Sequence, residues 1–177
     1  MKKNSEESLR AYVTSAAPSV NEALRNNQIE AVQGELDALD QCFTPIPDAK
    51  TLYRFMPASA VKPDSQNQIM DKGYQSCSDD MDLLFDHFSS DDLACLVITC
   101  PQGQLAIDVT ACLPEGNNEG EFILPRGIRL QVEQTETYLP EDFSHFAEVF
   151  DLNVSARELK ESYRICSITT YRCTPIA

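Results

Sequence analysis

The chain has 177 residues, 42% of them hydrophobic and 24% charged, a composition typical of a globular domain with a sizeable core. Its formal net charge of −14 argues against a nucleic-acid or anionic-membrane partner, because both attract basic surfaces. No apolar run approaches the roughly 18 residues of a membrane-spanning helix. The seven cysteines and two histidines contain no Cys-x-x-Cys pair, so we expect free thiols and no metal site.

The first 17 residues are polar and rich in small side chains. They include two lysines but lack the apolar stretch of a Sec signal peptide. We expect residues 1–17 to be a mobile lead or an export segment, and residues 18–177 to form a single domain.

Hydrophobic side chains after residue 18 recur at helical spacing. The pattern predicts one amphipathic helix, or a helical pair broken near Asn26 and Asn27, that ends before Pro45. The side chains that carry this pattern are Val20, Leu24, Ile29, Val32, Leu36 and Leu39.

Two further helical regions are predicted later in the chain. Residues 79–92 are acidic and place apolar side chains on one face. Residues 139–163 have helical spacing interrupted near Asn153, after which Ser155 and Glu158 have the spacing of a capping box. We also expect Ile69 and Met70 to cap a short helix.

The remaining apolar runs have the length and composition of β-strands. We expect residues 93–99 and 104–110 to form a hairpin around a turn at residues 101–103. Helices first, then strands, a helical insert and a last strand predict an α+β domain. The predicted strands are residues 51–56, 93–99, 104–110, a run that Glu121 opens, 128–132 and 165–173.

Five polar residues lie at or beside these strands. Arg54 lies inside an apolar run, and Ser76 and Ser78 follow a glycine. Glu119 and Glu121 are two residues apart where a strand begins. Residues two apart in a strand point the same way, so we expect both carboxylates to face one pocket.

The order of these motifs resembles that of the mono-ADP-ribosyltransferases of the Arg-Ser-Glu class, which include bacterial toxins, effectors and phage proteins. The resemblance covers residues 51–134. It rests on Leu-Tyr-Arg ending at Arg54, Gly-Tyr-Gln-Ser-Cys-Ser ending at Ser78, and Glu-Gly-Glu ending at Glu121, followed by Phe-Ile-Leu-Pro-Arg-Gly. It implies a mixed or antiparallel β core with an N-terminal helical segment and a helical insert before the last strand.

The resemblance also implies roles for these residues. Glu121 is the expected catalytic carboxylate, Ser76 holds it by a hydrogen bond, and Glu119 serves the incoming nucleophile. Arg54 is expected at the phosphates of NAD, where a guanidinium can donate two hydrogen bonds. The expected cofactor-binding residues are Arg54, Ser76, Ser78, Tyr74 and Phe88.

Two departures from the family pattern bear on cofactor binding. Cys77 stands where the family has threonine, and residues 73–125 contain no Arg or Lys. Positive charge near the phosphates must therefore come from Arg54, Lys62, Lys72 and Arg126.

The resemblance predicts an NAD-dependent enzyme that modifies a target protein of a host or competitor cell, on arginine, without a metal. The expected place of action is the target-cell cytosol after secretion, or the cytoplasm if the protein is phage-encoded. Two alternatives stay open: a non-catalytic acidic binding or inhibitor protein that masks a basic surface, and an NAD glycohydrolase without a protein acceptor. We expect the exposed side of the insert, residues 139–163, to help select the target.

Overall fold

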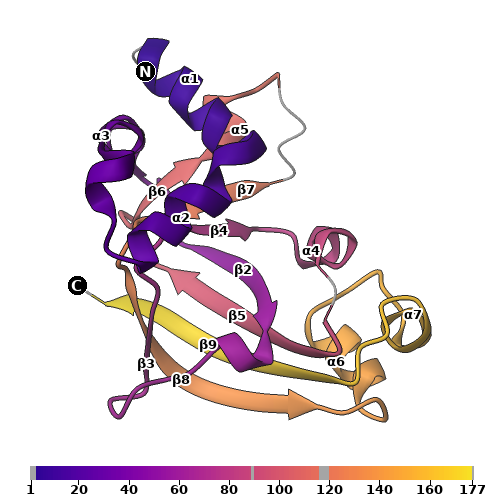
Figure 1. Ribbon diagram of the computed structural model, residues 1–177. Helices are drawn as coiled ribbons and strands as arrows, with labels where there is room; N and C mark the ends of the chain where they lie inside the picture. Colours follow the sequence, from indigo (N-terminus) through magenta and orange to yellow (C-terminus); the bar gives the residue numbers. More distant parts are fainter. Residues whose placement is uncertain (1–2, 89, 116–119, 177) are drawn as a thin grey trace. The chain divides into compact units, whose positions relative to one another are not determined.

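The computed structural model describes residues 3–88, 90–115 and 120–176 (Figure 1). They form two compact units, each built from several parts of the chain. The first unit comprises Met1–Ala49, Met70–Cys77 and Pro101–Ile128, and the second comprises Lys50–Ile69, Ser78–Cys100 and Arg129–Ala177. No helix among the described residues is long and apolar enough to cross a membrane.

The first unit begins with a helical segment. It consists of α1 (Lys3–Ala11), the π-helical turn η1 (Tyr12–Ala16), α2 (Ala17–Arg25), the 3-10 turn η2 (Ile29–Val32) and α3 (Gln33–Asp40). Of the two alternatives that the sequence left open, the structure has the helices broken near Asn26 and Asn27. Asn27 has a φ of 57°, a conformation that asparagine tolerates better than most residues. The helical segment starts at Lys3, with Leu9 and Tyr12 buried in the core.

Four strands of the first unit lie in the order β1-β6-β7-β4. They are β1 (Thr44–Pro45), β6 (Leu105–Asp108), β7 (Glu121–Leu124) and β4 (Gln75–Ser78), of which Ser78 belongs to the second unit. After β6 the chain turns into α5 (Val109–Cys112), because the Asp108 carboxylate accepts a hydrogen bond from the Ala111 N–H at 2.9 Å and caps the helix. Apolar side chains of the helices pack with Tyr74, Ile107 and Ile123 in one buried cluster.

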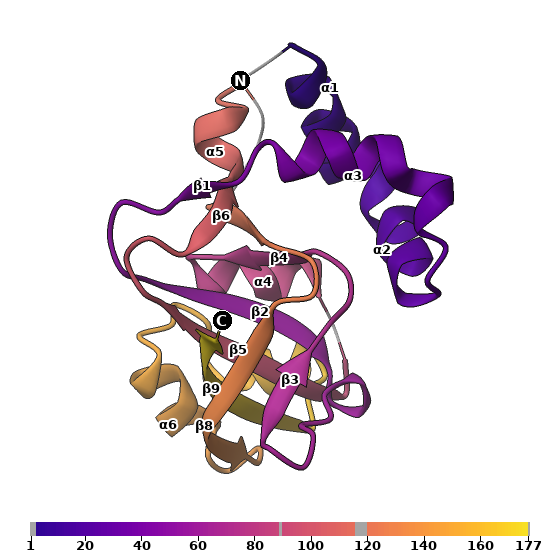
Figure 2. The same cartoon turned by 90° about the vertical axis from the view of Figure 1, so that its left-hand side faces the viewer.

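The second unit contains longer strands, in the order β2-β5-β9-β8-β3. They are β2 (Lys50–Pro57), β5 (Asp92–Cys100), β9 (Ser167–Ile176), β8 (Arg129–Tyr138) and β3 (Gln68–Met70). Strands β5 and β9 pair in parallel, whereas β2 with β5 and β8 with β9 pair antiparallel. Figure 2 shows β2, β5, β9 and β8 side by side. Strand β5 is buried over most of its length, as its continuous apolar sequence requires.

The second unit also contains the 3-10 turn η3 (Ala58–Ala60) and the short helices α4 (Met81–His87), α6 (Phe143–Val149) and α7 (Ala156–Glu161). Helices α4 and α6 contribute aromatic side chains to the core beside the strands. The predicted capping box is confirmed: Ser155 Oγ accepts from the Glu158 N–H, and Glu158 Oε2 accepts from the Ser155 N–H at 2.9 Å. The buried cluster under these helices contains Phe55, Phe85, Phe143, Phe146 and Leu159.

The predicted α+β class and mixed β core are therefore confirmed, and two local predictions are wrong. Residues 69 and 70 lie in strand β3 and do not cap a helix. The expected hairpin does not form: β5 pairs with β2 and β9, and β6 pairs with β1 and β7. The turn after β5 is held by Ile46, whose N–H donates to the Gln104 carbonyl at 2.9 Å and whose carbonyl accepts from the Gly103 N–H at 3.0 Å. These bonds direct β6 to β1.

Candidate active site

The first unit brings Ser76 and Glu121 together. They lie on β4 and β7, which are hydrogen-bonded neighbours in the sheet. The Ser76 hydroxyl hydrogen-bonds the Glu121 carboxylate, and the Glu121 side chain is half-buried. Burial raises the pKa of Glu121 above its ordinary value, and the Ser76 hydrogen bond partly opposes this by favouring the charged form. The pair therefore presents an oriented carboxylate at the start of a strand.

Glu119, the other predicted acidic residue, lies outside the described residues. Gly120, between it and Glu121, has a φ of 62°, which glycine adopts without steric cost. The backbone thus changes direction immediately before β7.

Tyr74, expected to contact NAD, is a core residue. It is 0% exposed, with the Tyr12 ring edge-on at 5.7 Å and the Phe43 ring stacked at 5.9 Å between centroids. Its hydroxyl donates to Asp40 Oδ1 at 2.6 Å. A ring so enclosed offers no surface to a cofactor, which argues against the expected contact and assigns Tyr74 to the support of β4.

Asp40 joins three segments of the first unit. As the last residue of α3 it accepts from Tyr74, and its Oδ2 accepts from Arg126 Nη2 at 2.8 Å. Arg126 follows β7 by two residues. Its side chain therefore serves an ion pair within the unit, although the sequence predicted it as a source of positive charge for phosphates.

Asp71 makes a second connection of the same kind. Its carboxylate accepts from Arg25 Nε at 3.0 Å and Nη2 at 2.6 Å, and from the Gly73 N–H at 2.9 Å. Its carbonyl accepts from the Gly127 N–H at 3.1 Å. The helical segment, the chain before β4 and the turn after β7 are thus fixed to one another twice. Sequence reasoning missed Asp40 and Asp71, since neither belongs to a recognisable motif.

The other predicted site residues belong to the second unit. Arg54 is half-buried on β2, opposite Leu96 of β5. Ser78 is 4% exposed, and its hydroxyl accepts from the Asp80 N–H at 3.0 Å just before α4. Phe88 is half-buried, and its ring centroid lies 6.5 Å from that of Phe55. Of these predicted site residues, Arg54 and Phe88 have partly exposed side chains, whereas Ser78 is buried.

Comparison with known proteins identifies the fold. No family model and no curated protein sequence matches the chain. Solved structures do match, with low sequence identity and nearly complete coverage of the chain. The toxin Plx2a from Paenibacillus larvae has a TM-score of 0.69 at 16% identity, over 100% of this chain and 88% of that one. The ATR domain of Salmonella SpvB has a TM-score of 0.70 at 16% identity, over 99% of this chain and 100% of that domain. The C3stau2 protein of Staphylococcus aureus, solved with NAD, has a TM-score of 0.69 at 13% identity, over 99% and 88%.

The chain has the fold of the ADP-ribosyltransferase toxins. The resemblance inferred from the three sequence motifs is thereby confirmed at the level of the fold. In this ADP-ribosyltransferase fold the chain places Ser76 and Glu121 on neighbouring strands of the first unit, and Arg54 on β2 of the second.

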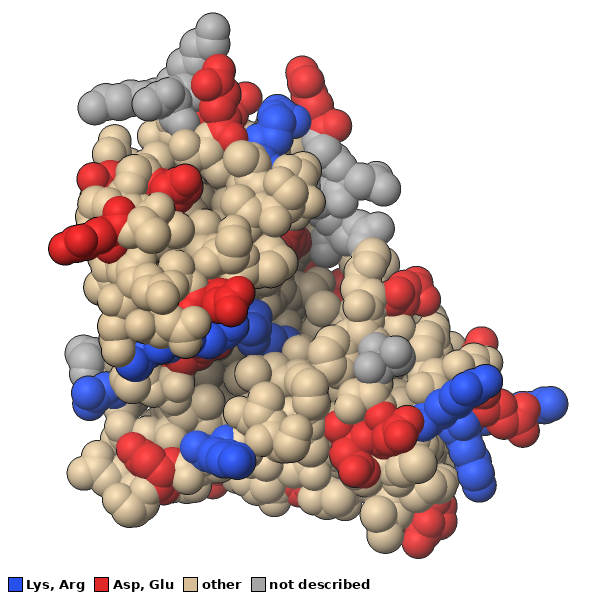
Figure 3. All heavy atoms as spheres, in the orientation of Figure 1, with Lys and Arg blue, Asp and Glu red and all other residues tan. Residues whose placement is uncertain are grey.

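Charge is unevenly distributed on this ADP-ribosyltransferase fold. Acidic side chains are spread widely over the face shown in Figure 3, whereas basic ones gather in fewer places. Several basic residues already have partners: Arg25 pairs with Asp71, Arg126 with Asp40, and Lys72 donates to Asn27 at 3.0 Å. Among the described residues no group of three or more His, Cys, Asp or Glu side chains could hold a metal ion.

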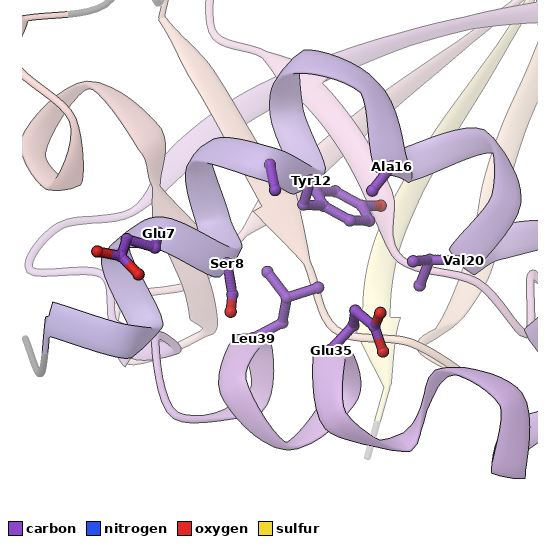
Figure 4. A pocket seen from close by; sticks show the side chains of 8 residues that line it. Glu7, Ser8, Tyr12, Ala16, Val20, Glu35 and Leu39 are labelled. Atoms are coloured by element: carbon purple, nitrogen blue, oxygen red, sulfur yellow. The ribbon is translucent and has the colours of Figure 1, made fainter.

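A cavity of about 280 Å³ lies among the N-terminal helices. Figure 4 shows Tyr12 and Leu39 on its walls, with Glu7 and Glu35 on opposite sides of them. The rest of its lining is small or apolar: Ser8, Ala11, Ala16 and Val20. Neither Ser76 nor Glu121 lines it, so this cavity is separate from the candidate site.

Proposed function

We propose that the protein is an NAD-dependent mono-ADP-ribosyltransferase that releases nicotinamide and transfers ADP-ribose to a target protein, with arginine as the acceptor. The observation that carries the proposal is the Ser76–Glu121 hydrogen bond, found in a chain with the fold of ADP-ribosyltransferase toxins. Two proteins of similar fold were solved with NADH or NAD: the C. perfringens toxin BECa and C3stau2.

The chemistry requires little acid catalysis. Breaking the bond between nicotinamide and ribose returns the bonding electrons to the pyridine ring, which is a good leaving group, and leaves an oxocarbenium-like ribose. The Glu121 carboxylate stabilises that positive charge and accepts a hydrogen bond from the ribose 2′-hydroxyl. Ser76 fixes the direction of the carboxylate, so that no reorganisation is needed when charge develops.

The acceptor then forms a new bond to the ribose carbon. A guanidinium is a poor nucleophile at neutral pH because its pKa is far above 7. Glu119 is the proposed base that removes its proton as the bond forms. With water in place of the acceptor, the same site would hydrolyse NAD.

We propose cofactor-related roles for three further residues. Arg54 binds phosphate oxygens of NAD, Phe88 packs near the nicotinamide, and Ser78 supports the strand on which Ser76 lies. Replacing Arg54 by alanine should weaken NAD binding by about 1.5–3 kcal/mol, the range for a hydrogen bond to a charged group. Calorimetric titration measures this, and Lys160→Ala, at an exposed lysine of α7 with no expected role in NAD binding, is the control for the loss of one positive charge.

The deciding experiment measures two products from the same reaction. Purified protein is incubated with NAD and cell proteins, free nicotinamide is quantified, and transfer of labelled ADP-ribose is located by mass spectrometry. Wild type should yield both products, Glu121→Gln neither, and Ser76→Ala roughly 10- to 100-fold less of each, as for loss of a charge-assisted hydrogen bond.

The possible results separate the alternatives. Nicotinamide without labelled protein would identify a glycohydrolase. No nicotinamide and no NAD binding would favour the acidic inhibitor. If transfer occurs, the identity of the modified residue tests whether arginine is the acceptor. The proposed place of action is the cytosol of a target cell after export, or the producing cell's cytoplasm for a phage protein.

A further inference from the structure

The Asp40 carboxylate accepts hydrogen bonds from two residues that flank the strands of the proposed catalytic pair, β4 and β7. Asp40 Oδ1 accepts from the Tyr74 hydroxyl at 2.6 Å, and Asp40 Oδ2 accepts from Arg126 at 2.8 Å. Tyr74 directly precedes β4 and lies two residues before Ser76. Arg126 lies two residues after the end of β7, the strand that Glu121 opens. Asp40 thus connects the chain before Ser76 to the chain after Glu121.

Tyr74, just before β4, is anchored both through its ring and through its backbone N–H. Its ring is enclosed by Tyr12 and Phe43, and its backbone N–H donates to Asn21 Oδ1 at 2.8 Å. Tyr74 is followed directly by Gln75, the first residue of β4. These contacts therefore fix where β4 begins and limit how far Ser76, two residues later, can move.

We propose that Asp40 is a positioning residue that holds β4 and β7 in the relation that lets the Ser76 hydroxyl meet the Glu121 carboxylate. It acts through Tyr74 and Arg126 and has no direct role in chemistry. The catalytic importance of the Ser76–Glu121 pair rests on the function proposed above.

A carboxylate suits this place for two reasons. The buried Tyr74 hydroxyl needs an acceptor, because an unsatisfied buried donor is costly. Arg126 needs an anion, and the two carboxylate oxygens serve the two donors separately. The side chains of Arg126 and Asp40 are 35% and 40% exposed, so solvent screens their attraction. The main contribution of Asp40 is therefore geometric.

The first test measures the pH titration of the Glu121 carboxyl group by NMR, without any substrate, to detect its hydrogen bond with Ser76. The protein is labelled with ¹³C at glutamate carboxyl carbons, and the Glu121 signal is identified by its absence from Glu121→Gln. Because Ser76 favours the charged form of Glu121, loss of the hydrogen bond must raise the titration midpoint of that signal. We expect an upward shift in Ser76→Ala and in Asp40→Ala, and no further shift when both are combined.

Two further variants guard against a general loss of structure. Tyr74→Phe removes only the hydroxyl that Asp40 accepts and keeps the ring in the core, so it should shift the midpoint in the same direction. Asp37→Ala is the matched control: Asp37 is exposed on the same helix, and its carboxylate accepts from Gln33 of that helix at 2.6 Å. It should leave the Glu121 midpoint unchanged.

The second test is kinetic. Asp40→Ala and Tyr74→Phe should lower kcat for nicotinamide release on the order of 10- to 100-fold, the cost of misplacing a catalytic group. KM for NAD should stay within about twofold, since neither side chain is proposed to touch NAD. Asp37→Ala should match wild type in both constants.

The outcomes separate this inference from the proposed function. A shifted Glu121 midpoint in Ser76→Ala but not in Asp40→Ala or Tyr74→Phe overturns the role of Asp40. An unshifted midpoint in all three variants overturns the hydrogen bond on which that role depends. If Glu121→Gln still releases nicotinamide, the proposed function fails, and the titration still decides whether Asp40 positions Ser76.

Discussion

The side chain of Asn21 on α2 holds the backbone of Tyr74, 53 residues later in the chain, by a hydrogen bond of 2.8 Å from the Tyr74 N–H. Its amide nitrogen donates to the Tyr12 hydroxyl at 3.0 Å. The residue beside this contact is Gly73, where a Cβ would lie 2.7 Å from Asn21 Oδ1. The absence of a side chain at position 73 is therefore what allows α2 to approach the chain that leads into β4.

Gly73→Ala should consequently destabilise the protein. The new methyl group would displace the Asn21 side chain and break one or both of its hydrogen bonds, at a cost of about 1–3 kcal/mol. Urea denaturation measures the change in the free energy of unfolding. In an Asn21→Ala background the same substitution should cost much less, because the obstructing side chain is gone.

Gly34 provides the control for the general effect of replacing glycine. It lies in α3, and no atom within 4 Å would meet its Cβ. Gly34→Ala should stabilise the protein by roughly 0.5–1 kcal/mol, since alanine favours the helix. Equal costs for Gly73→Ala with and without Asn21 would show that the contact with Asn21 is unimportant.

Glu121 should lower stability at neutral pH. Its pKa is raised in the folded protein, chiefly by burial, so the native state binds a proton more tightly than the unfolded chain. The free energy of unfolding then falls as pH rises from the ordinary glutamate pKa through the raised one. Glu121→Gln cannot ionise, and it should raise Tm at pH 7, with the gain shrinking towards pH 4. A gain of equal size at both pH values would indicate altered packing.

The cysteines should differ sharply in reactivity. Cys166 is exposed and Cys112 half-buried, whereas the other free thiols are buried. Burial raises the pKa of Cys100 to about 11 and that of Cys173 to about 12, which keeps them as unreactive thiols at pH 8. Ellman's reagent should therefore modify Cys166 fast, Cys112 more slowly, and the rest only on unfolding. Cys166→Ser should abolish the fast phase; a fast phase that persists would mean that another thiol is accessible.

Glu119 should separate hydrolysis from transfer if it is the base for an arginine acceptor. Glu119→Gln keeps hydrogen bonding but loses proton acceptance, so transfer should fall roughly 10²–10⁴-fold, the usual worth of such catalysis. Nicotinamide release in water should persist, because Arg54, Ser76 and Glu121 remain. Glu115→Gln, an exposed glutamate earlier in the same loop, is the matched control. Equal loss of both activities would assign Glu119 to NAD binding, and unchanged transfer would point to a serine or threonine acceptor.

The sequence alone determined the features that depend on local patterns. Apolar spacing predicted helical structure before Pro45, the apolar strand β5 and the last strand, because helix and strand periods are imposed by backbone geometry over a few residues. The Ser155 capping box was predictable for the same reason, since both partners lie within one turn. The motifs around Arg54, Ser76 and Glu121 were enough to identify the resemblance in fold.

Only the tertiary structure decided which distant groups meet. The hydrogen bond from Arg126 to Asp40 spans 86 positions, and that from Tyr74 to Asp40 spans 34. No periodicity encodes such pairings, because they arise when packing of the apolar faces brings the helices onto β4 and β7. The same packing turned Tyr74 from an expected cofactor contact into a core residue, and it paired β6 with β1 and β7. Burial and long-range hydrogen bonds belong to the assembled fold, and a linear pattern of residue types does not contain them.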